Sequence, residues 1–417
     1  MLATIVKRDR ELQLIDLGSV AQLTKAIDTW RATKGTSEEA RQAGITIRKQ
    51  IWEPLLEHTN GANTILISAD GVLGQMPLAA LPGKEPGTYL IEDHRIAMIP
   101  VPRMIPELVE VERSSESKGE LLLLGDVDYE ASPAGDLSSD KQEQAGENSP
   151  TQVIKERFTE LPGAADEVAA IEALHRRLVD ADSDDVKVLK RSLASETEFR
   201  KLAGNYRVLH LATHGFFAPP EIKSALGASS LKRSGRSRLT SSESIVTGMN
   251  PDLLSGLAFA GANLEPVPGE DDGILTAQEI AFLPLDGVET AVLSACQTGL
   301  GEVAGGEGLI GIQRAFQIAG VRTTVASLWK VDDQATRKLM ELFYTNLIEK
   351  NMGHLDALRE AQLHILNNPE SIYSSSIATD KMRVPRSPSL GVGGTNETDG
   401  RASPELWAAF QISGDWK

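Results

Sequence analysis

Short apolar runs alternate with amphipathic stretches along most of the chain. The run ELLLLGD at 120–126 is typical of a strand that is buried on both faces of a sheet. The stretch GAADEVAAIEALHRRL at 163–178 repeats apolar residues at helical spacing. Because strands and helices keep alternating toward the C-terminus, the pattern predicts an α/β fold. Its central sheet should be mainly parallel and covered by helices on both faces.

The first part of the chain is predicted to hold smaller elements. A hairpin is expected over 2–18, and helices are expected over 20–34 and 38–58. Two short strands, over 88–93 and 95–100, should follow before the regular alternation begins.

Three segments are rich in small and polar residues and interrupt this pattern. They lie near 126–155, 217–273 and 367–404. Because such segments hold few apolar anchors, we predict that they form mobile loops.

Composition narrows the classes of protein that this chain can belong to. Its formal net charge of −17 argues against a nucleic-acid partner, which would need a basic face. No stretch approaches the ~20 apolar residues that span a bilayer, so no membrane partner is expected. The start of the chain lacks a long apolar stretch of the secretory kind, and a single cysteine fits a reducing compartment. We therefore expect a cytoplasmic protein.

The single cysteine, Cys296, also limits the cofactors. An intrachain disulfide is impossible, and a cysteine-based zinc site is disfavoured. The phosphate-binding motif G-x-x-x-x-G-K-[ST] does not occur. We predict neither a metal nor a cofactor.

Two segments carry the candidate chemistry. VLHLATHG ends at Gly215, and VLSACQTG ends at Gly299. Each is an apolar strand that breaks into small and polar residues. Reactive groups in open α/β sheets gather at the C-terminal ends of strands. If the two strands are neighbours, His214 and Cys296 face each other at that edge.

The two side chains suit nucleophilic catalysis. A free thiol is mostly protonated at neutral pH, and a nearby imidazole can remove its proton. The oxyanion that forms needs hydrogen-bond donors that are already aimed at it. The backbone amides of Gly215 and Cys296 are the natural candidates.

Simpler interpretations of these residues stay open at this point. A lone cysteine such as Cys296 is equally well explained as a small buried side chain. His210 and His214 stand four residues apart, which on a helix would suggest a metal site. Their segment is predicted to be a strand, so His210 is better explained as a core residue.

The chain also resembles a known family. HLATHG and LSACQTGLG resemble the His and Cys boxes of the CHAT domain, a branch of the caspase-like peptidases related to separase. DGVLGQMPLAALPG, LPGAADEVAAI and AGVRTTVASLWKVDDQAT resemble further CHAT segments in the same order. The collinear set covers nearly the whole chain.

The resemblance implies a fold and a division of the chain. It implies a caspase-like three-layer sandwich over 119–417, preceded by a degenerate, pseudo-protease half over 1–118. It also implies that His214 and Cys296 form a catalytic dyad and that Gly215 supplies an oxyanion amide. The residue after the cysteine is Gln297, where the family usually has an acidic residue.

The segment at the C-terminal end of the predicted strand VRTTVASLW could select the substrate. It resembles the strand that walls the P1 pocket in separase-like enzymes. Asp332 or Asp333 could pair with a basic P1 side chain, and Trp329 could line the pocket. The alternative is that one aspartate caps the next helix and that Trp329 is a core residue.

We therefore predict a cysteine endopeptidase that acts on a protein substrate. Many CHAT proteins carry helical repeats in the same chain, but no such period is found here. A partner of helical-repeat or other type, or a signal, would then regulate the enzyme. The alternative is a catalytically silent CHAT-type scaffold that only binds other proteins.

Overall fold

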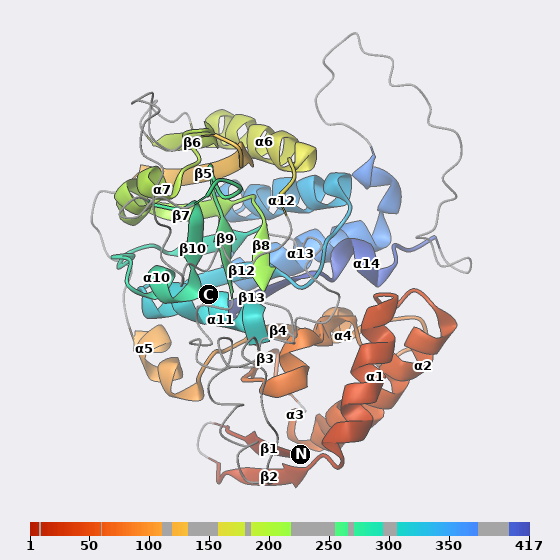
Figure 1. Cartoon of the computed structure of the whole chain (residues 1–417). Coiled ribbons are helices and arrows are strands. Elements are labelled where there is room, and N and C mark those ends of the chain that lie inside the picture. Colours follow the sequence, from red (N-terminus) through yellow and green to blue (C-terminus); the bar gives the residue numbers. More distant parts are fainter. Residues whose placement is uncertain are drawn as a thin grey trace, which may run out of the picture. The chain divides into compact units, whose positions relative to one another are not determined.

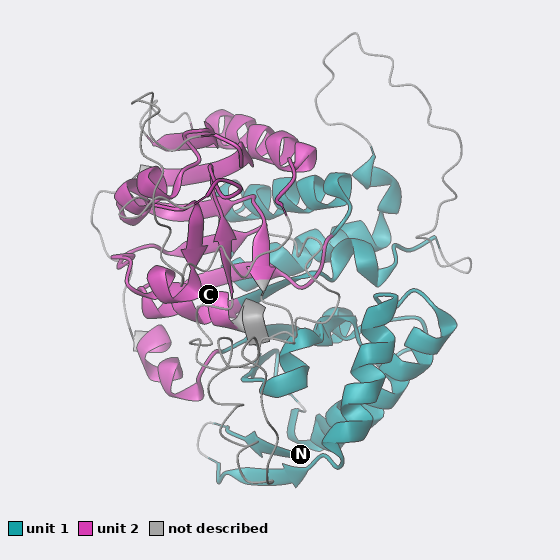
Figure 2. Ribbon diagram, viewed as in Figure 1, with its two compact units in different colours: residues 1–99, 331–412, 416–417 teal, residues 100–330, 413–415 magenta. Residues whose placement is uncertain are grey.

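The computed structural model describes ten stretches of the 417-residue chain. They are residues 1–7, 10–59, 61–110, 119–131, 157–179, 185–217, 255–265, 271–294, 307–373 and 400–417. They cluster into two compact units, drawn in teal and magenta in Figure 2. Unit 1 comprises residues 1–99, 331–412 and 416–417, and unit 2 comprises 100–330 and 413–415. This clustering does not test the expected division at residue 118, which stays a prediction.

Unit 1 combines a hairpin, a short parallel strand pair and two sets of helices. The predicted hairpin is confirmed, because its strands β1 and β2 pair antiparallel. The strands β3 and β4 pair parallel. The N-terminal elements are β1 (Leu2–Ile5), β2 (Gln13–Asp16), α1 (Val20–Ala32), α2 (Glu38–Ile47), α3 (Leu56–Thr59), β3 (Thr64–Ile67), α4 (Leu90–Asp93) and β4 (Arg95–Met98). The C-terminal helices are α12 (Asp333–Ile348), α13 (His354–Asn367) and α14 (Pro404–Trp407), and β13 (Phe410–Gly414) begins in this unit.

Two expectations for unit 1 were wrong in detail. The helix expected over 38–58 is broken after α2 into a π-helix, Arg48–Trp52, a 3-10 turn, Glu53–Leu55, and α3. Pro54 lies in the 3-10 turn and lacks the N–H that a continuous helix would need. The strand expected over 88–93 is the helix α4, whose Glu92 carboxylate accepts a hydrogen bond from the Tyr89 N–H at 2.8 Å.

Unit 2 contains five parallel strands in the order β12-β11-β7-β5-β6, of which β12, β7, β5 and β6 are labelled in Figure 1. An antiparallel sheet of order β10-β9-β8 lies in the same unit. The strands of the parallel sheet are β5 (Gly119–Val127), β6 (Val186–Arg191), β7 (Tyr206–Leu211), β11 (Thr290–Leu293) and β12 (Thr323–Ser327). Those of the antiparallel sheet are β8 (Gly215–Phe217), β9 (Ser255–Ala258) and β10 (Ile274–Thr276). The unit's helices are α5 (Ile105–Glu110), α6 (Pro162–Val179), α7 (Glu196–Leu202), α10 (Ala277–Ala281) and α11 (Glu307–Ile318).

The two faces of the parallel sheet bury different side chains. Alternate residues of β5, β7 and β11 join a large core with aromatic residues of α7 and α11, namely Phe199 and Phe316. The helix α6 packs on β5 and β6. Gly125 of β5 permits its close approach, because a Cβ there would lie 2.7 Å from Val168 Cγ2. The mixed α/β fold with a mainly parallel sheet, expected from the sequence, is therefore confirmed.

Residues 255–265 belong to this core, although they fall inside the loop expected near 217–273. They form β9 and a buried turn, in which Phe259 and Ala260 are almost fully buried. Among the described residues, no helix combines the length and the apolar character needed to cross a membrane.

Glu196 at the start of α7 makes unit 2 sensitive to pH. Burial raises the pKa of Glu196 to about 7, and its ion pair with Arg200 offsets this only in part. A raised carboxyl pKa means that the folded protein binds a proton more tightly than the unfolded chain. Glu196 therefore contributes stability below about pH 4.5, and this contribution is lost as the pH rises to about 7.

We expect Glu196→Gln to remove this pH dependence. As the pH rises from 4.5 to 7, the loss of this contribution should lower the unfolding free energy of wild type by at most about 3 kcal/mol. Urea titrations at pH 5 and pH 8 measure the difference. Glu39→Gln, at an exposed site, should keep the wild-type difference. An equal slope with pH in wild type and Glu196→Gln would contradict the assignment.

Candidate active site

The strands that carry the two boxes are neighbours, as expected. In the parallel pair of β7 and β11, His210 is aligned with Val292 and Leu211 with Leu293. Both strands therefore end at the same edge of the sheet. His214 lies three residues beyond β7, and Ser294 directly follows β11. Cys296 lies outside the described residues, as does Gln297.

His214 is fully buried, and one of its nitrogens is held by a carbonyl. Its Nε2 lies 2.6 Å from the backbone oxygen of Thr159, in the segment before α6. Because a carbonyl oxygen only accepts hydrogen bonds, Nε2 must carry the hydrogen. In the neutral ring the lone pair is then on Nδ1. The imidazole also packs against Tyr129 and Phe158, with ring centroids 5.1 and 5.5 Å away, and these two rings contact each other at 5.7 Å.

The surroundings of His214 favour its neutral form. Burial lowers the pKa of the imidazole, and the positive charge of Lys330 lowers it further. The hydrogen bond to Thr159 acts in the opposite direction but is the smaller effect. His214 is therefore neutral at pH 7 and can accept a proton.

The backbone of His214 is fixed by strand β9 and by Tyr129. The His214 carbonyl accepts a hydrogen bond from the Ala258 N–H at 2.9 Å. The His214 N–H donates to the Tyr129 hydroxyl, which in turn donates to Thr213 Oγ1 at 3.0 Å. The Thr213 hydroxyl donates to the Ala258 carbonyl. Burial raises the pKa of Tyr129 to about 12, so its hydroxyl keeps the proton that this chain requires.

The Thr159 carbonyl is held in place by Asn263, which follows β9. The Asn263 side-chain oxygen accepts from the Phe158 N–H at 2.8 Å, and its Nδ2 donates to the Phe158 carbonyl at 2.8 Å. This pair of bonds fixes the backbone one residue before Thr159. The position of His214 therefore depends on segments far away in the sequence.

Gly215 begins strand β8, and the pairing of β8 with β9 decides where its backbone N–H points. Ala258 donates to the His214 carbonyl, and in an antiparallel ladder such a bond flanks a pair of the non-hydrogen-bonded kind. The next pair, Gly215 and Leu257, is then of the non-hydrogen-bonded kind. The Gly215 N–H is therefore directed away from β9.

The three residues expected to select the substrate lie after β12. Strand β12 pairs parallel with β11, as expected, and Trp329 just beyond it is buried. Asp332 belongs to unit 1, where its carboxylate accepts from the N–H groups of Gln334 and Ala335, each at 3.0 Å. Asp332 is thus the N-cap of α12, and Asp333 is the first residue of that helix. Their part in substrate selection stays a prediction.

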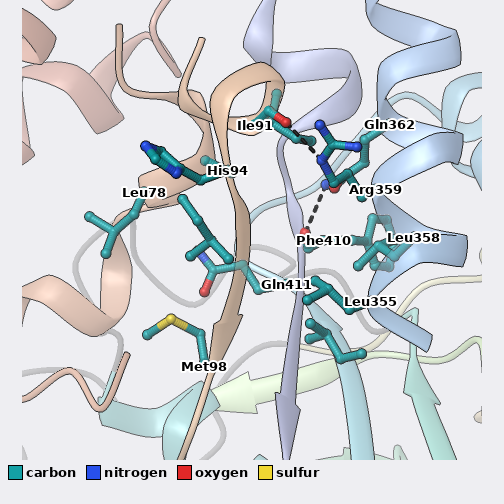
Figure 3. A pocket seen from close by; sticks show the side chains of 13 residues that line it. Leu78, Ile91, His94, Met98, Leu355, Leu358, Arg359, Gln362, Phe410 and Gln411 are labelled. Carbon is teal, nitrogen blue, oxygen red and sulfur yellow. Dashed lines mark hydrogen bonds between the residues drawn. The ribbon is translucent and has the colours of Figure 1, made fainter. Parts of the chain in front are cut away.

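A cavity in unit 1 is unrelated to this chemistry. It lies among β4, α13 and β13, and Figure 3 shows its lining. Arg359 and Gln362 donate hydrogen bonds there to the carbonyls of Ile91 and Phe410. With a volume of about 30 Å³ open to water, it has room for ordered water. Across the described stretches, no group of three or more His, Cys, Asp or Glu residues could hold a metal ion.

Comparison with known proteins places the chain in a family. The family model of the CHAT domain matches residues 41–415. The chain belongs to the CHAT domain family. No curated protein matches this CHAT chain. Among solved structures it is similar to the Arg-specific cysteine proteinase gingipain R (RgpB), with 10% identity and a TM-score of 0.43. That match covers 95% of this chain and 74% of the gingipain chain.

Sequence reasoning missed the residues that hold His214. Thr159 acts through its backbone carbonyl, which has no signature in the sequence. Tyr129 comes from a segment without a recognisable motif. Asn263 lies in NPDLLSGLAFAGANL, which resembles a CHAT segment, but no role was expected for its side chain. Thr213 stands inside the His box and could have been noticed as a polar neighbour of His214.

We expect Tyr129→Phe to weaken the site without unfolding the CHAT chain. The change removes the acceptor of the His214 N–H and costs about 1–3 kcal/mol of stability, because it leaves a buried donor unpaired. The rate at which iodoacetamide labels the Cys296 thiol should fall about tenfold as His214 loses its fixed position. Thermal unfolding and labelling kinetics measure the two effects. Tyr344→Phe, at a buried tyrosine in unit 1, should leave the labelling rate unchanged.

Proposed function

We propose that this CHAT chain is a cysteine endopeptidase in which His214 is the base and Cys296 the nucleophile. The observation that carries the proposal is the hydrogen bond between His214 Nε2 and the Thr159 carbonyl. It places the hydrogen on Nε2 and the lone pair on Nδ1, so Nδ1 is the nitrogen that takes up a proton in this buried ring at the end of β7. The neighbouring strand β11 leads to Cys296 two residues after Ser294.

The reaction begins with a proton transfer. His214 Nδ1 takes the proton of the Cys296 thiol, and the thiolate attacks the carbonyl carbon of the scissile peptide bond. The Nε2–H bond to Thr159 stabilises the imidazolium that forms. The backbone amides of Gly215 and Cys296 donate to the oxyanion of the tetrahedral intermediate.

Two stages follow: the tetrahedral intermediate collapses to a thioester, and water then hydrolyses that thioester. His214 gives its proton to the leaving amine, the C–N bond breaks, and the acyl group stays on the Cys296 sulfur. Water attacks this thioester, with His214 again as the base, and releases the carboxylic acid and the thiol. No metal or cofactor takes part in these steps.

The substrate in this proposal is a protein. Trp329 walls the P1 pocket, and Asp332 or Asp333 pairs with a basic P1 side chain. Asp333 is the better candidate for this pairing, because the Asp332 carboxylate already accepts hydrogen bonds from two backbone N–H groups. A partner protein or a signal regulates the cleavage.

Covalent labelling tests the proposal. A mixture of peptidyl acyloxymethyl ketones, varied at P1, should label wild type at a single site, and peptide mapping should place that site at Cys296. Cys296→Ser should remove the label while keeping the fold. A wild-type protein that stays unlabelled by every member, although its thiol reacts with iodoacetamide, would instead support the silent scaffold.

A further inference from the structure

Three polar side chains meet beneath the candidate site and take no part in the proposed proton transfers. Glu167 is on α6, His210 is on β7, and Ser294 follows β11. All three are buried, with 4%, 0% and 7% of their surface exposed. Glu167 lies beyond the first turn of α6, and its side chain is turned into the protein.

One carboxylate contacts both of the strands that carry the boxes. Glu167 Oε1 lies 3.1 Å from His210 Nε2, the distance of an ion pair. These two atoms are not aligned as a hydrogen bond, so we take the contact as electrostatic. Glu167 Oε2 accepts a hydrogen bond from the Ser294 hydroxyl at 3.0 Å. The cluster thus joins α6, β7 and β11.

The geometry excludes a second catalytic triad here. In such a triad the serine hydroxyl bonds to histidine, whereas Ser294 bonds to the carboxylate. The three side chains are also too deeply buried for a substrate to reach them. A structural role is the remaining explanation, and the place of the cluster in the fold indicates which part of the protein it supports.

The position of the cluster is at the ends of the two strands. His210 precedes His214 by four residues, and Ser294 precedes Cys296 by two. Burying a carboxylate costs several kcal/mol that an apolar side chain would not cost. Glu167 is therefore costly as a mere core residue, whereas a carboxylate can bond two strands in one fixed relation.

We propose that Glu167 is a positioning residue for the dyad, because its carboxylate holds the end of β11, through Ser294, against the end of β7, through His210. This inference rests on the proposed function of His214 and Cys296. Loss of the Ser294 bond lets the end of β11 shift, and the proposed proton transfer from Cys296 to His214 then slows.

Ser294→Ala tests this inference and has a matched control. Ser327 ends β12, the strand on the other side of β11, and Leu293 is aligned with Ala326 in that pair. The Ser327 hydroxyl is also buried, but within the described stretches it has no hydrogen-bond partner. Ser294→Ala and Ser327→Ala therefore remove the same buried hydroxyl at equivalent places on adjacent strands, one bonded to Glu167 and one not.

The pH dependence of Cys296 alkylation by iodoacetamide gives the first measurement. In Ser294→Ala the pH midpoint should rise by about 1, because a displaced His214 no longer takes the Cys296 proton and the thiolate loses the imidazolium that stabilises it. The kcat for peptide cleavage should fall about tenfold to a hundredfold with KM within about twofold. Ser327→Ala should keep the wild-type midpoint and kcat. Glu167→Gln, which keeps the side-chain volume, should move the midpoint in the same direction as Ser294→Ala.

The outcomes separate this inference from the proposed function. A folded Ser294→Ala protein with the wild-type midpoint and kcat would overturn the positioning role, whatever the peptidase does. Equal shifts in Ser294→Ala and Ser327→Ala would also overturn it, because the effect would then be general to buried hydroxyls. A midpoint that moves only in Ser294→Ala and Glu167→Gln, in a protein that no peptidyl electrophile labels, would support positioning and refute the peptidase.

Discussion

Replacing Cys296 or His214 by Ala is expected to lower kcat/KM for peptide cleavage by at least about 10⁴-fold. The two residues act in one proton transfer, so either loss removes the whole step. The double variant should therefore be little worse than either single one. Steady-state kinetics on the best substrate of a fluorogenic peptide library measure all three variants.

His175→Ala is the matched control for the histidine. His175 on α6 is also buried, and burial lowers its pKa as it does for His214, but it lies outside the candidate site. This variant should lose stability and keep most of its kcat/KM after correction for the folded fraction. If His214→Ala retained activity in a folded protein, the choice of His214 as base would be refuted.

The sequence predicted the arrangement of the two strands that carry the boxes better than it predicted the contacts that hold His214. The pattern of β7 and β11 was enough to expect neighbouring strands, because each reads as an apolar strand that ends in a Gly-containing box. It was also enough to single out His214, which the structure holds at the end of β7. The expected place of His210 in the core is confirmed, since its side chain is fully buried.

The rest depended on contacts between segments that are distant in the sequence. The Thr159 carbonyl reaches His214 across 55 residues, and Asn263 reaches Phe158 across 105. Backbone groups carry no pattern, so such contacts have no local signal. The contacts of Glu167 with His210 and Ser294 likewise join residues that are distant in the sequence, so no local pattern predicts them.

Local errors have local causes. Leu90 and Ile91 were assigned to a strand because both are apolar, but both are buried in the short helix α4. The helix over 38–58 was drawn through Pro54, where the chain instead changes to a 3-10 turn. At Leu90 and Ile91 the hydrophobic pattern located the buried residues correctly and misassigned their backbone.

Two glycines that pack at β9 give the second prediction. A Cβ on Gly256 of β9 would lie 2.6 Å from the Leu275 carbonyl oxygen and 2.6 Å from the Phe216 ring. A backbone carbonyl cannot move aside as a flexible side chain can. A Cβ on Gly311 of α11 would lie 3.4 Å from Ser255 Oγ, which is close to an ordinary contact. The same methyl group is therefore expected to have opposite effects at the two sites.

Gly256→Ala should lower the unfolding free energy by about 1–3 kcal/mol, because the core around β9 cannot accommodate the added volume. Gly311→Ala should raise it by up to about 1 kcal/mol, since alanine is the better residue inside a helix. Urea unfolding at pH 7 measures both.

Gly256→Ala should also slow labelling of Cys296 in the folded protein. The reason is that β9 supplies the Ala258 N–H that fixes the His214 carbonyl, and a displaced β9 displaces the base with it. Gly311→Ala should label at the wild-type rate. A Gly256→Ala protein as stable and as reactive as wild type would show that β9 can move without affecting His214, and the backbone clamp would then have no part in holding the base.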